Sequence, residues 1–130
     1  MLNRILAPRR IVNAHCDLPC GVYDPAQARI EAESVKACQQ KWQDSDDDLF
    51  KARAVTIKEE RADLVKHHLW VLWTDYFKPE HLEAHPGLHE MFWKATKEAG
   101  AAKKSNDPAQ GQQLLDAVDE IGKVFWETKS

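Results

Sequence analysis

Residues 15–27 read His-Cys-Asp-Leu-Pro-Cys-Gly-Val-Tyr-Asp-Pro-Ala-Gln, and the last four predict where the first helix begins. Aspartate caps a helix N-terminus, proline suits the first helical position, and a glutamine in the first turn can complete a capping box. The same tetrapeptide, Asp-Pro-Ala-Gln, returns at residues 107–110. We interpret the repetition as capping chemistry used twice rather than as a duplicated domain, so it predicts a second helix start.

Apolar residues at helical spacing divide the chain from residue 24 onward into four predicted helices. These run from Asp24 to about Trp42, from Leu49 to about Phe77, from Pro86 through a fading end at 100–105, and from Asp107 past Phe125. Pro79 ends the second helix, because the residue before a proline avoids helical backbone. Residues 81–85 are a predicted connector with at most one helical turn. No strand-like alternation competes, so the predicted fold class is all-α, an antiparallel four-helix bundle.

The apolar faces of these helices predict the core of the bundle. They comprise Ala28, Ala32, Val35 and Trp42; Ile57, Leu64, His68, Val71 and Leu72; Leu88, Met91, Phe92 and Ala95; and Leu114, Leu115, Val118, Ile121 and Phe125. Cys38 is interpreted as a packed apolar thiol of the first helix. The five tryptophans are expected in the core or at an interface. The histidines from residue 67 to residue 89 lack a zinc motif and are interpreted as surface or packing residues.

Length and composition narrow the classes of protein that this chain can belong to. Its 130 residues suit one domain, and its net charge of −3 argues against a nucleic-acid-binding surface. No stretch approaches the roughly 20 apolar residues that a membrane span needs, so no membrane partner is expected. Three cysteines, an odd number, do not form a disulfide framework. In a reducing cytosol, clustered thiols favour metal or redox chemistry.

The first 14 residues differ from the rest of the chain. They contain Arg4, Arg9 and Arg10 and no acidic residue, and the arginines and Pro8 interrupt every apolar run that could act as an export signal. Asn13-Ala14 resembles a small-residue cleavage site. Two interpretations stay open, an ordinary N-terminus and a removable propeptide over residues 1–14 that precedes a domain over residues 15–130. The missing export signal predicts a cytoplasmic location.

A dense group of metal donors lies between this leader and the first helix. Residues 15–23 hold an imidazole, two thiols and a phenol. Thiolates and imidazoles prefer nickel, copper, zinc or iron to magnesium or calcium. Cys16 and Cys20 are four residues apart, which is not the redox Cys-x-x-Cys spacing, and no second cysteine pair is present for a four-thiolate zinc site. The segment therefore predicts one metal ion bound by a short N-terminal hook.

Cleavage after Ala14 would make this donor set more specific. His15 would then offer a free α-amine, and the amine, the Cys16 amide nitrogen and the Cys16 thiolate would form two fused chelate rings. The Cys20 thiolate would be the fourth planar ligand, and a square plane of nitrogen and sulfur suits nickel(II) or copper(II). The His15 imidazole could add an axial ligand that favours a higher oxidation state, so the metal could cycle by one electron.

The residues that carry this chemistry resemble the nickel superoxide dismutase family. The whole nickel-hook motif, His-Cys-Asp-Leu-Pro-Cys-Gly-Val-Tyr, stands at residues 15–23. The resemblance continues through Asp24-Pro25, Arg61, His67-His68, Trp73, the segment from Asp75 to Pro79, and Phe125-Trp126-Glu127. It implies a four-helix bundle that assembles as a homohexamer with one nickel ion per subunit. It also implies the reaction 2 O2•− + 2 H+ → O2 + H2O2, with superoxide as the substrate and a protease that removes the leader.

The resemblance also implies which residues form the metal site. The implied nickel ligands are the amine and imidazole of His15, the amide nitrogen and thiolate of Cys16, and the thiolate of Cys20. Tyr23 would order substrate and water at the vacant face of the metal, and Asp17 would belong to the same rim. The resemblance thus makes cleavage before His15 a condition of activity.

Further residues are implied around the site. Glu31 and Arg61 would orient the axial imidazole, although a plain ion pair between helices is the alternative. Tyr76 would be a second tyrosine near the site, and Lys78 would help to attract the superoxide anion. A structural Tyr76 and a merely solvated Lys78 are the competing interpretations. Pro19 would shape the turn of the hook, which a cis peptide bond could do.

A second function class remains for the same residues. In a non-enzymatic metal-binding or thiol redox-sensing module, Cys16 and Cys20 would carry or sense a metal while the helices bind partners. Such a module would act without cleavage of the leader, and its function would depend less on His15 than on the cysteines.

Overall fold

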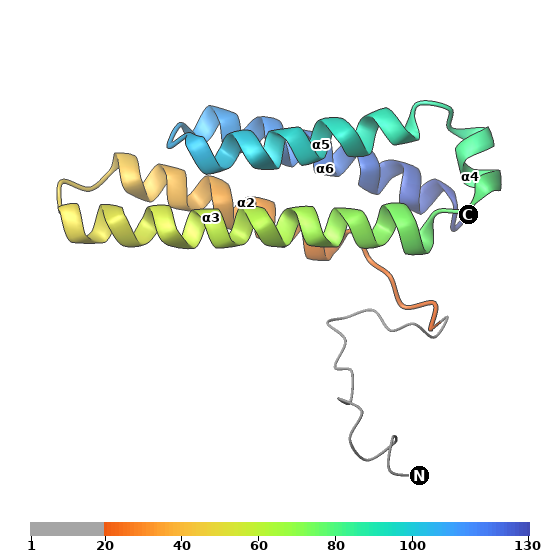
Figure 1. Ribbon diagram of the computed structural model, residues 1–130, viewed down its shortest axis with the longest axis horizontal. Coiled ribbons are helices and arrows are strands. Elements are labelled where there is room, and N and C mark those ends of the chain that lie inside the picture. The colour runs from red at the N-terminus through yellow and green to blue at the C-terminus, as the bar shows by residue number, and fades with distance from the viewer. Residues whose placement is uncertain (1–19) are drawn as a thin grey trace, which may run out of the picture.

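The computed structural model describes residues 20–130, and this part of the chain is helical with no strand. Its elements are α2 (Ala26–Gln43), α3 (Asp48–Val71), the π-helical segment η1 (Leu72–Tyr76), α4 (Pro79–Ala84), α5 (Leu88–Lys104) and α6 (Pro108–Glu127). The four long helices lie side by side, and the short α4 closes one end of the molecule (Figure 1).

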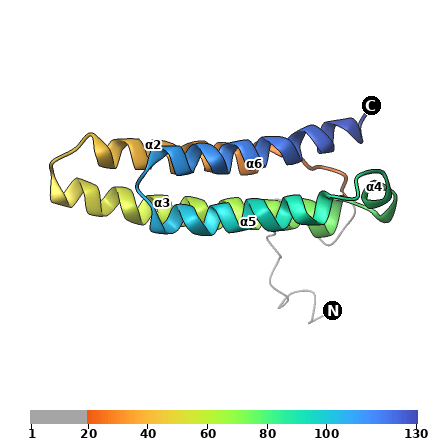
Figure 2. The ribbon, with the colours of Figure 1, turned by 90° about the horizontal axis from the view of Figure 1, so that it is seen from above.

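The long helices form an antiparallel bundle in two layers. α2 packs against α3 and α6, and α5 packs against the same two helices. Seen from above, α2 and α6 form one layer and α3 and α5 the other (Figure 2). Each helix runs antiparallel to both of its neighbours, which confirms the fold class predicted from the sequence.

Most of the predicted core faces are buried. All five predicted positions on α6, from Leu114 to Phe125, are buried, and so are Ala28, Ala32 and Val35 on α2. On α5, Leu88, Phe92 and Ala95 are buried and Met91 packs against the core. These faces show the 3.6-residue period of helices that each bury one stripe.

The two Asp-Pro-Ala-Gln segments begin helices in the same way. The Asp24 carboxylate accepts a hydrogen bond of 2.8 Å from the amide of Ala26, and the Asp107 carboxylate accepts one of 2.9 Å from the amide of Ala109. Each aspartate thus satisfies one of the amides that a helix start leaves without a partner. The prediction of shared capping chemistry is confirmed.

The predicted buried stripe of α3 is confirmed at its C-terminal end, where Val71 and Leu72 are buried, but it was wrong along the rest of the helix. Ile57 is 39% exposed, and Leu64 and His68 are only half-buried. The residues that face the bundle are Ala54, Lys58, Ala62, Val65 and Leu69. Small alanines let α3 approach its neighbours closely, and Lys58 turns inward because its ammonium donates hydrogen bonds to the Ser105 carbonyl oxygen at 2.6 Å and Asn106 Oδ1 at 2.8 Å.

The end of the second predicted helix and the connector after it also differ. α3 changes into a π-helical turn, in which the amide of Phe77 donates to the carbonyl of Leu72, five residues earlier, at 3.0 Å. Such turns are rare and often occur at functional sites. The predicted connector forms α4, and the third long helix begins at Leu88 rather than at Pro86, because Pro86-Gly87 makes a turn first.

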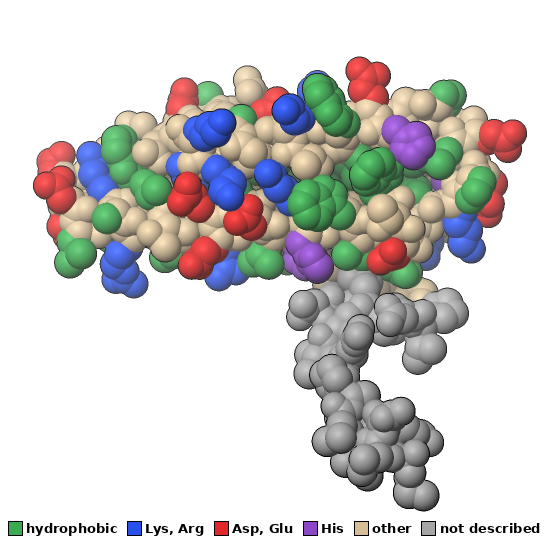
Figure 3. Space-filling view, viewed as in Figure 1, with side chains coloured by type: hydrophobic (Ala, Val, Ile, Leu, Met, Phe, Trp, Pro, Cys, Tyr) green, Lys and Arg blue, Asp and Glu red, His purple; other side chains and the backbone are tan. Residues whose placement is uncertain are grey.

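The tryptophans are not core residues. Trp70, Trp73, Trp93 and Trp126 are between 37% and 65% exposed, and Trp42 is half-buried. On the face formed by α3 and α5, exposed hydrophobic side chains gather in the half nearer α4 (Figure 3). Their predicted alternative role, at an interface, stays a prediction. Among residues 20–130, no helix is both long and apolar enough to cross a bilayer.

Candidate metal centre

The described part of the hook is a short turn that leads into α2. Cys20 is exposed, and the amide of Val22 donates to its sulfur at 3.5 Å. Gly21 has a φ of 71°, the left-handed region that favours glycine. Of the predicted ligands only Cys20 lies in the described residues, because His15 and Cys16 precede residue 20, as do Asp17 and Pro19.

The chemistry of this donor set fits nickel. A thiol on an exposed turn, preceded by a second thiol, an imidazole and backbone nitrogens, offers the nitrogen and sulfur donors that suit nickel(II) or copper(II). Within residues 20–130, no group of three or more histidine, cysteine, aspartate or glutamate side chains could hold a metal ion. A metal site that uses Cys20 therefore needs donors from the residues before it.

Two tyrosines meet where the hook joins the bundle. The ring centroids of Tyr23 and Tyr76 lie 5.4 Å apart, with planes inclined by 57°. The Tyr76 ring also contacts Phe125 of α6 at 4.4 Å and stacks on His81 of α4 at 5.8 Å. The π-helical turn thus places Tyr76 beside Tyr23, where the hook, α4 and α6 converge, and the role of Tyr76 near a metal stays a prediction.

The C-terminal end of α6 completes this aromatic cluster. The hydroxyl of Tyr76 is hydrogen-bonded to Thr128 Oγ1, and Lys129 Nζ lies 5.1 Å from the centroid of the Tyr76 ring. Neither Thr128 nor His81 was predicted from the sequence to lie in this cluster. Thr128 is 52 residues from Tyr76, and no local pattern pairs the two.

Glu31 and Arg61 are brought together across α2 and α3. Arg61 Nη1 lies 3.2 Å from Glu31 Oε2, and the Glu31 side chain is only 16% exposed. The structure therefore contains the predicted pair. Cys38, also on α2, feels the charge of Arg61. Burial raises the pKa of its thiol, and the charge of Arg61 opposes that shift. A raised pKa agrees with the interpretation of Cys38 as a packed thiol.

Lys78 lies at the start of α4, two residues after Tyr76. It is exposed, and its amide donates to His81 Nδ1 at 3.0 Å. That hydrogen bond fixes the His81 ring against Tyr76. Lys78 is thus an exposed cation close in sequence to Tyr76.

The remaining histidines have packing roles, as predicted. Trp73 Nε1 donates to His89 Nδ1 at 2.8 Å, and His85 Nε2 lies 3.5 Å from Glu127 Oε2. The rings of His67 and His68 are half-buried and contact each other edge to face, with centroids 5.5 Å apart.

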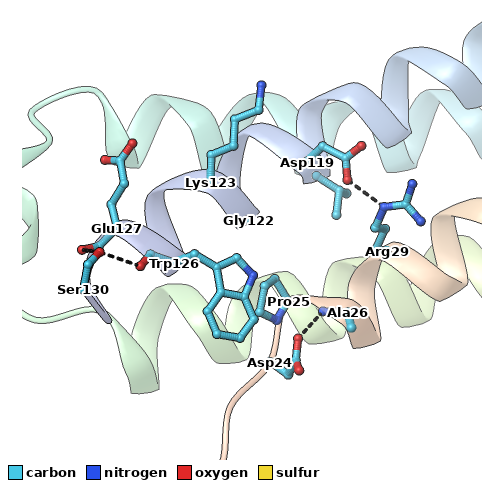
Figure 4. Close-up of a pocket in the computed structure, with 11 residues that line it drawn as sticks. Asp24, Pro25, Ala26, Arg29, Asp119, Gly122, Lys123, Trp126, Glu127 and Ser130 are labelled. Atoms are coloured by element: carbon cyan, nitrogen blue, oxygen red, sulfur yellow. Dashed lines mark hydrogen bonds and ion pairs between the residues drawn. The ribbon is translucent and has the colours of Figure 1, made fainter.

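A groove of about 870 Å³ runs between the start of α2 and the end of α6 (Figure 4). Its floor includes Pro25, Gly122 and Trp126, and Arg29 and Asp119 form an ion pair of 2.9 Å at one end. None of the lining residues that the structure describes is a cysteine or a histidine, whereas Cys20 lies on the hook.

Comparisons with known proteins agree with this geometry. The sequence profile of the family described as nickel-containing superoxide dismutase matches residues 10–129. Superoxide dismutase [Ni] of Streptomyces seoulensis is 62% identical over 99% of this chain and 98% of its own, and that of Streptomyces coelicolor is 60% identical over the same shares. The native structure of a nickel superoxide dismutase superposes with a TM-score of 0.87 at 62% identity, covering 88% of this chain and 98% of that chain. The chain therefore belongs to the nickel-containing superoxide dismutase family, whose cofactor is nickel and whose reaction is the dismutation of superoxide.

Proposed function

We propose that this chain, once cleaved before His15, dismutates superoxide with one nickel ion held by His15, Cys16 and Cys20. The observation that carries the proposal is the complete donor motif at residues 15–23, which ends at the contact of Tyr23 with Tyr76 in a chain of this family. Exposure of Cys20 on a tight turn supports its role, because a ligand must reach the ion without disturbing the helices.

Solved variants of nickel superoxide dismutase support the choice of residues. They are described as having a histidine at the first position replaced by alanine, an aspartate at the third replaced by alanine, and a tyrosine at the ninth replaced by phenylalanine. Counted from His15, the same residue types in this chain are His15, Asp17 and Tyr23. Further structures are described by nickel ligation in an oxidised state and after partial reduction, which supports a redox role of the metal.

The same numbering supports removal of residues 1–14. A histidine numbered as the first residue of a solved chain supports a mature chain that begins at His15, whose amine would be the ligand that the leader blocks. The alignment with the native solved structure covers 98% of that chain but only 88% of this one. We therefore propose a processing protease that cuts after Ala14 and leaves a mature domain over residues 15–130.

Bound nickel would supply a one-electron couple between its +2 and +3 states, which oxidises one superoxide to dioxygen and reduces the next to hydrogen peroxide. The chain's own residues would prepare the site for a small anion. Tyr23 and Asp17 would order substrate and water at the open face of the metal. Tyr76 would hold the Tyr23 ring in place by packing against it. Arg61 and Glu31 would orient the imidazole of His15, since metal-bound histidines usually depend on such partners.

Lys78 would act before the reaction begins. Without the three arginines of residues 1–14 the net charge of −3 becomes −6, so the processed protein repels an anionic substrate on average, and a local cation offsets that repulsion near the site. Its exposure and its position two residues from Tyr76 support this role. The effect would weaken as ionic strength rises, because salt screens exposed charges.

We also propose a homohexamer in the cytoplasm. Four tryptophans are exposed in the described part of the single chain, and exposed hydrophobic side chains gather on the face of α3 and α5 (Figure 3). Apolar surface of this kind is typical of contact sites. An assembly would bury indoles that otherwise remain in water. Sedimentation of the native protein tests the number of subunits.

The decisive experiment compares two forms of the chain after loading with nickel. Residues 15–130 with His15 as the first residue should accelerate superoxide decay and retain about one nickel per subunit, whereas the chain of residues 1–130 should do neither. Equal activity of the two forms would contradict a role of the terminal amine. It would favour the alternative, a metal-binding or thiol-sensing module that works without cleavage.

Substitution of the thiols separates the site from the fold. Cys20→Ser in the processed chain should abolish nickel retention and activity while helicity stays unchanged, because Cys20 is exposed and precedes α2. Cys38→Ser is the matched control, since Cys38 lies within α2 and should leave activity unchanged. Full activity of Cys20→Ser would remove the hook from the mechanism.

A further inference from the structure

Thr128 makes two hydrogen bonds at the end of α6, and together they determine where the hydroxyl protons of Thr128 and Tyr76 point. Its Oγ1 is 2.5 Å from the carbonyl oxygen of Phe125 and 2.5 Å from the hydroxyl of Tyr76. Thr128 is the C-terminal cap residue of α6, so its backbone is held by the last turn of that helix. Phe125 is buried and Tyr76 is partly buried, and both belong to the cluster that also holds the Tyr23 ring.

The direction of the two bonds follows from the chemistry of hydroxyl groups. A carbonyl oxygen only accepts, and a hydroxyl has one proton to donate. Thr128 therefore donates its proton to Phe125, and its oxygen can only accept from Tyr76. The phenolic proton of Tyr76 is thus committed to Thr128, while the phenolic oxygen keeps capacity to accept.

The Tyr76 ring is held on several sides besides this bond. It lies against Phe125 at 4.4 Å and against His81 at 5.8 Å, and the ammonium of Lys129 lies 5.1 Å from its centroid. These contacts limit rotation of the ring plane, but none of them involves the hydroxyl. Among residues 20–130, Thr128 is the hydrogen-bond partner that fixes where that hydroxyl points.

We propose that Thr128 is a positioning residue of this family's reaction in this chain. Its oxygen accepts the phenolic proton of Tyr76 and so fixes the orientation of the ring against which Tyr23 packs. The inference rests on the proposed function of the hook, since Tyr23 borders the metal only in that proposal. One consequence is that Tyr76 does not supply the protons that dismutation consumes. Its proton points towards the end of α6.

The chain offers a test that does not need nickel, because Tyr23 and Tyr76 are its only tyrosines. Tyrosine ring signals in the magnetic resonance spectrum of the metal-free, full-length chain would be measured after ¹³C labelling and assigned with Tyr76→Phe. Thr128→Val keeps the shape of the side chain and removes the hydroxyl, and it should shift both signals. Thr128→Ser restores the hydroxyl and should restore both. Thr56→Val is the matched control, because Thr56 also donates to a carbonyl within a helix, far from the cluster in sequence, and should shift neither.

The processed, nickel-loaded chain provides the second readout. Thr128→Val should lower turnover by about threefold to tenfold, the change expected for one lost neutral hydrogen bond, while Thr128→Ser stays near the parent. Unmoved tyrosine signals in Thr128→Val, or equal shifts in Thr128→Val and Thr128→Ser, would overturn the proposal. If Thr128→Val does not fold, Tyr76→Phe provides the test, because it also removes the hydrogen bond to Thr128. An unchanged Tyr23 signal in Tyr76→Phe would overturn the proposal. An inactive parent with the expected shifts would instead contradict the proposed function and leave the positioning role intact.

Discussion

The two ends of the bundle use polar side chains in different ways. At the end near the α5–α6 connection, Gln39 and Lys58 are buried, and both donate to the carbonyl oxygen of Ser105. At the other end, Tyr23, Tyr76 and Thr128 are partly buried and lie where the hook leaves the bundle. We call these the loop end and the hook end.

The difference teaches which polar groups serve the fold and which serve the reaction. At the loop end, the donors of Lys58 and Gln39 point to oxygens of the connection and of α6, so they hold two helices and their loop together. At the hook end, the hydroxyl of Tyr76 is fixed by Thr128 while its ring supports the segment that carries Cys20. Changes at the loop end should therefore cost stability and spare activity per folded molecule.

The largest expected effect at the loop end comes from Gly111. A Cβ atom there would lie 2.8 Å from Lys36 Cβ and 2.9 Å from its Cα, and it would also overlap the buried side-chain oxygen of Gln39. Because a backbone atom cannot yield cheaply, Gly111→Ala should lower the free energy of unfolding by about 3 kcal/mol. Urea denaturation followed by circular dichroism measures it.

Gly122 is the matched control on the same helix at the hook end. A Cβ atom there would meet only Pro25, at an ordinary 3.8 Å. Gly122→Ala should leave stability unchanged or raise it by up to about 1 kcal/mol, because alanine costs less entropy to fold than glycine. Equal losses in the two variants would show that the helices can separate and that the contact at Gly111 is not tight.

Local signals in the sequence predicted much of the fold, whereas contacts between helices did not follow from it. Asp24 and Asp107 act on amides two residues away, so their capping is legible in the sequence. The inward turn of Lys58 depends on oxygens at residues 105 and 106, almost fifty positions later. Lysine side chains are normally exposed. The sequence therefore predicted Ile57, and not Lys58, as the buried residue of α3.

Removal of the Lys58 ammonium should have the second largest effect. In Lys58→Met, Asn106 Oδ1 loses the one donor that the described residues give it, while the Ser105 carbonyl keeps Gln39. The free energy of unfolding should fall by about 1 kcal/mol, the lower end of the cost of leaving an acceptor without a partner, because Asn106 is only partly buried.

Lys94→Met, on the exposed face of α5, is the control and should change stability little. Superoxide decay per folded, nickel-loaded molecule should match the parent in both variants. A loss of specific activity in Lys58→Met alone would break the division of labour between the two ends.

The candidate site was predictable to the extent that its chemistry is contiguous. The donors of residues 15–23 stand next to one another, so the hook could be inferred from the order of residues alone. Tyr76 and Lys78 were predicted as site residues only from the resemblance to the family, and Thr128 was not predicted. The π-helical turn that directs Tyr76 to Thr128 has no signal in the sequence, because it depends on how α4 and α6 close that end of the bundle.

The smallest expected effect concerns Cys38, the thiol that the hook does not use. Burial raises the pKa of this thiol, against the opposing charges of Arg61, Lys41 and Lys58. The folded chain therefore holds the thiol proton more tightly than the unfolded chain does. The resulting stability is complete below the ordinary thiol pKa and is lost as pH rises through the raised value.

Urea denaturation of the parent and of Cys38→Ser at about pH 7 and about pH 10 isolates this contribution, because the other titrating groups cancel in the difference. The stability of the parent relative to Cys38→Ser should fall between the two pH values by less than about 1 kcal/mol, since Cys38 is only partly buried and solvent screens its charge. A parent that gains relative stability at the higher pH would mean that the three cations prevail over burial. Charge rather than packing would then dominate at Cys38, and the interpretation of Cys38 as a packed apolar thiol would fail.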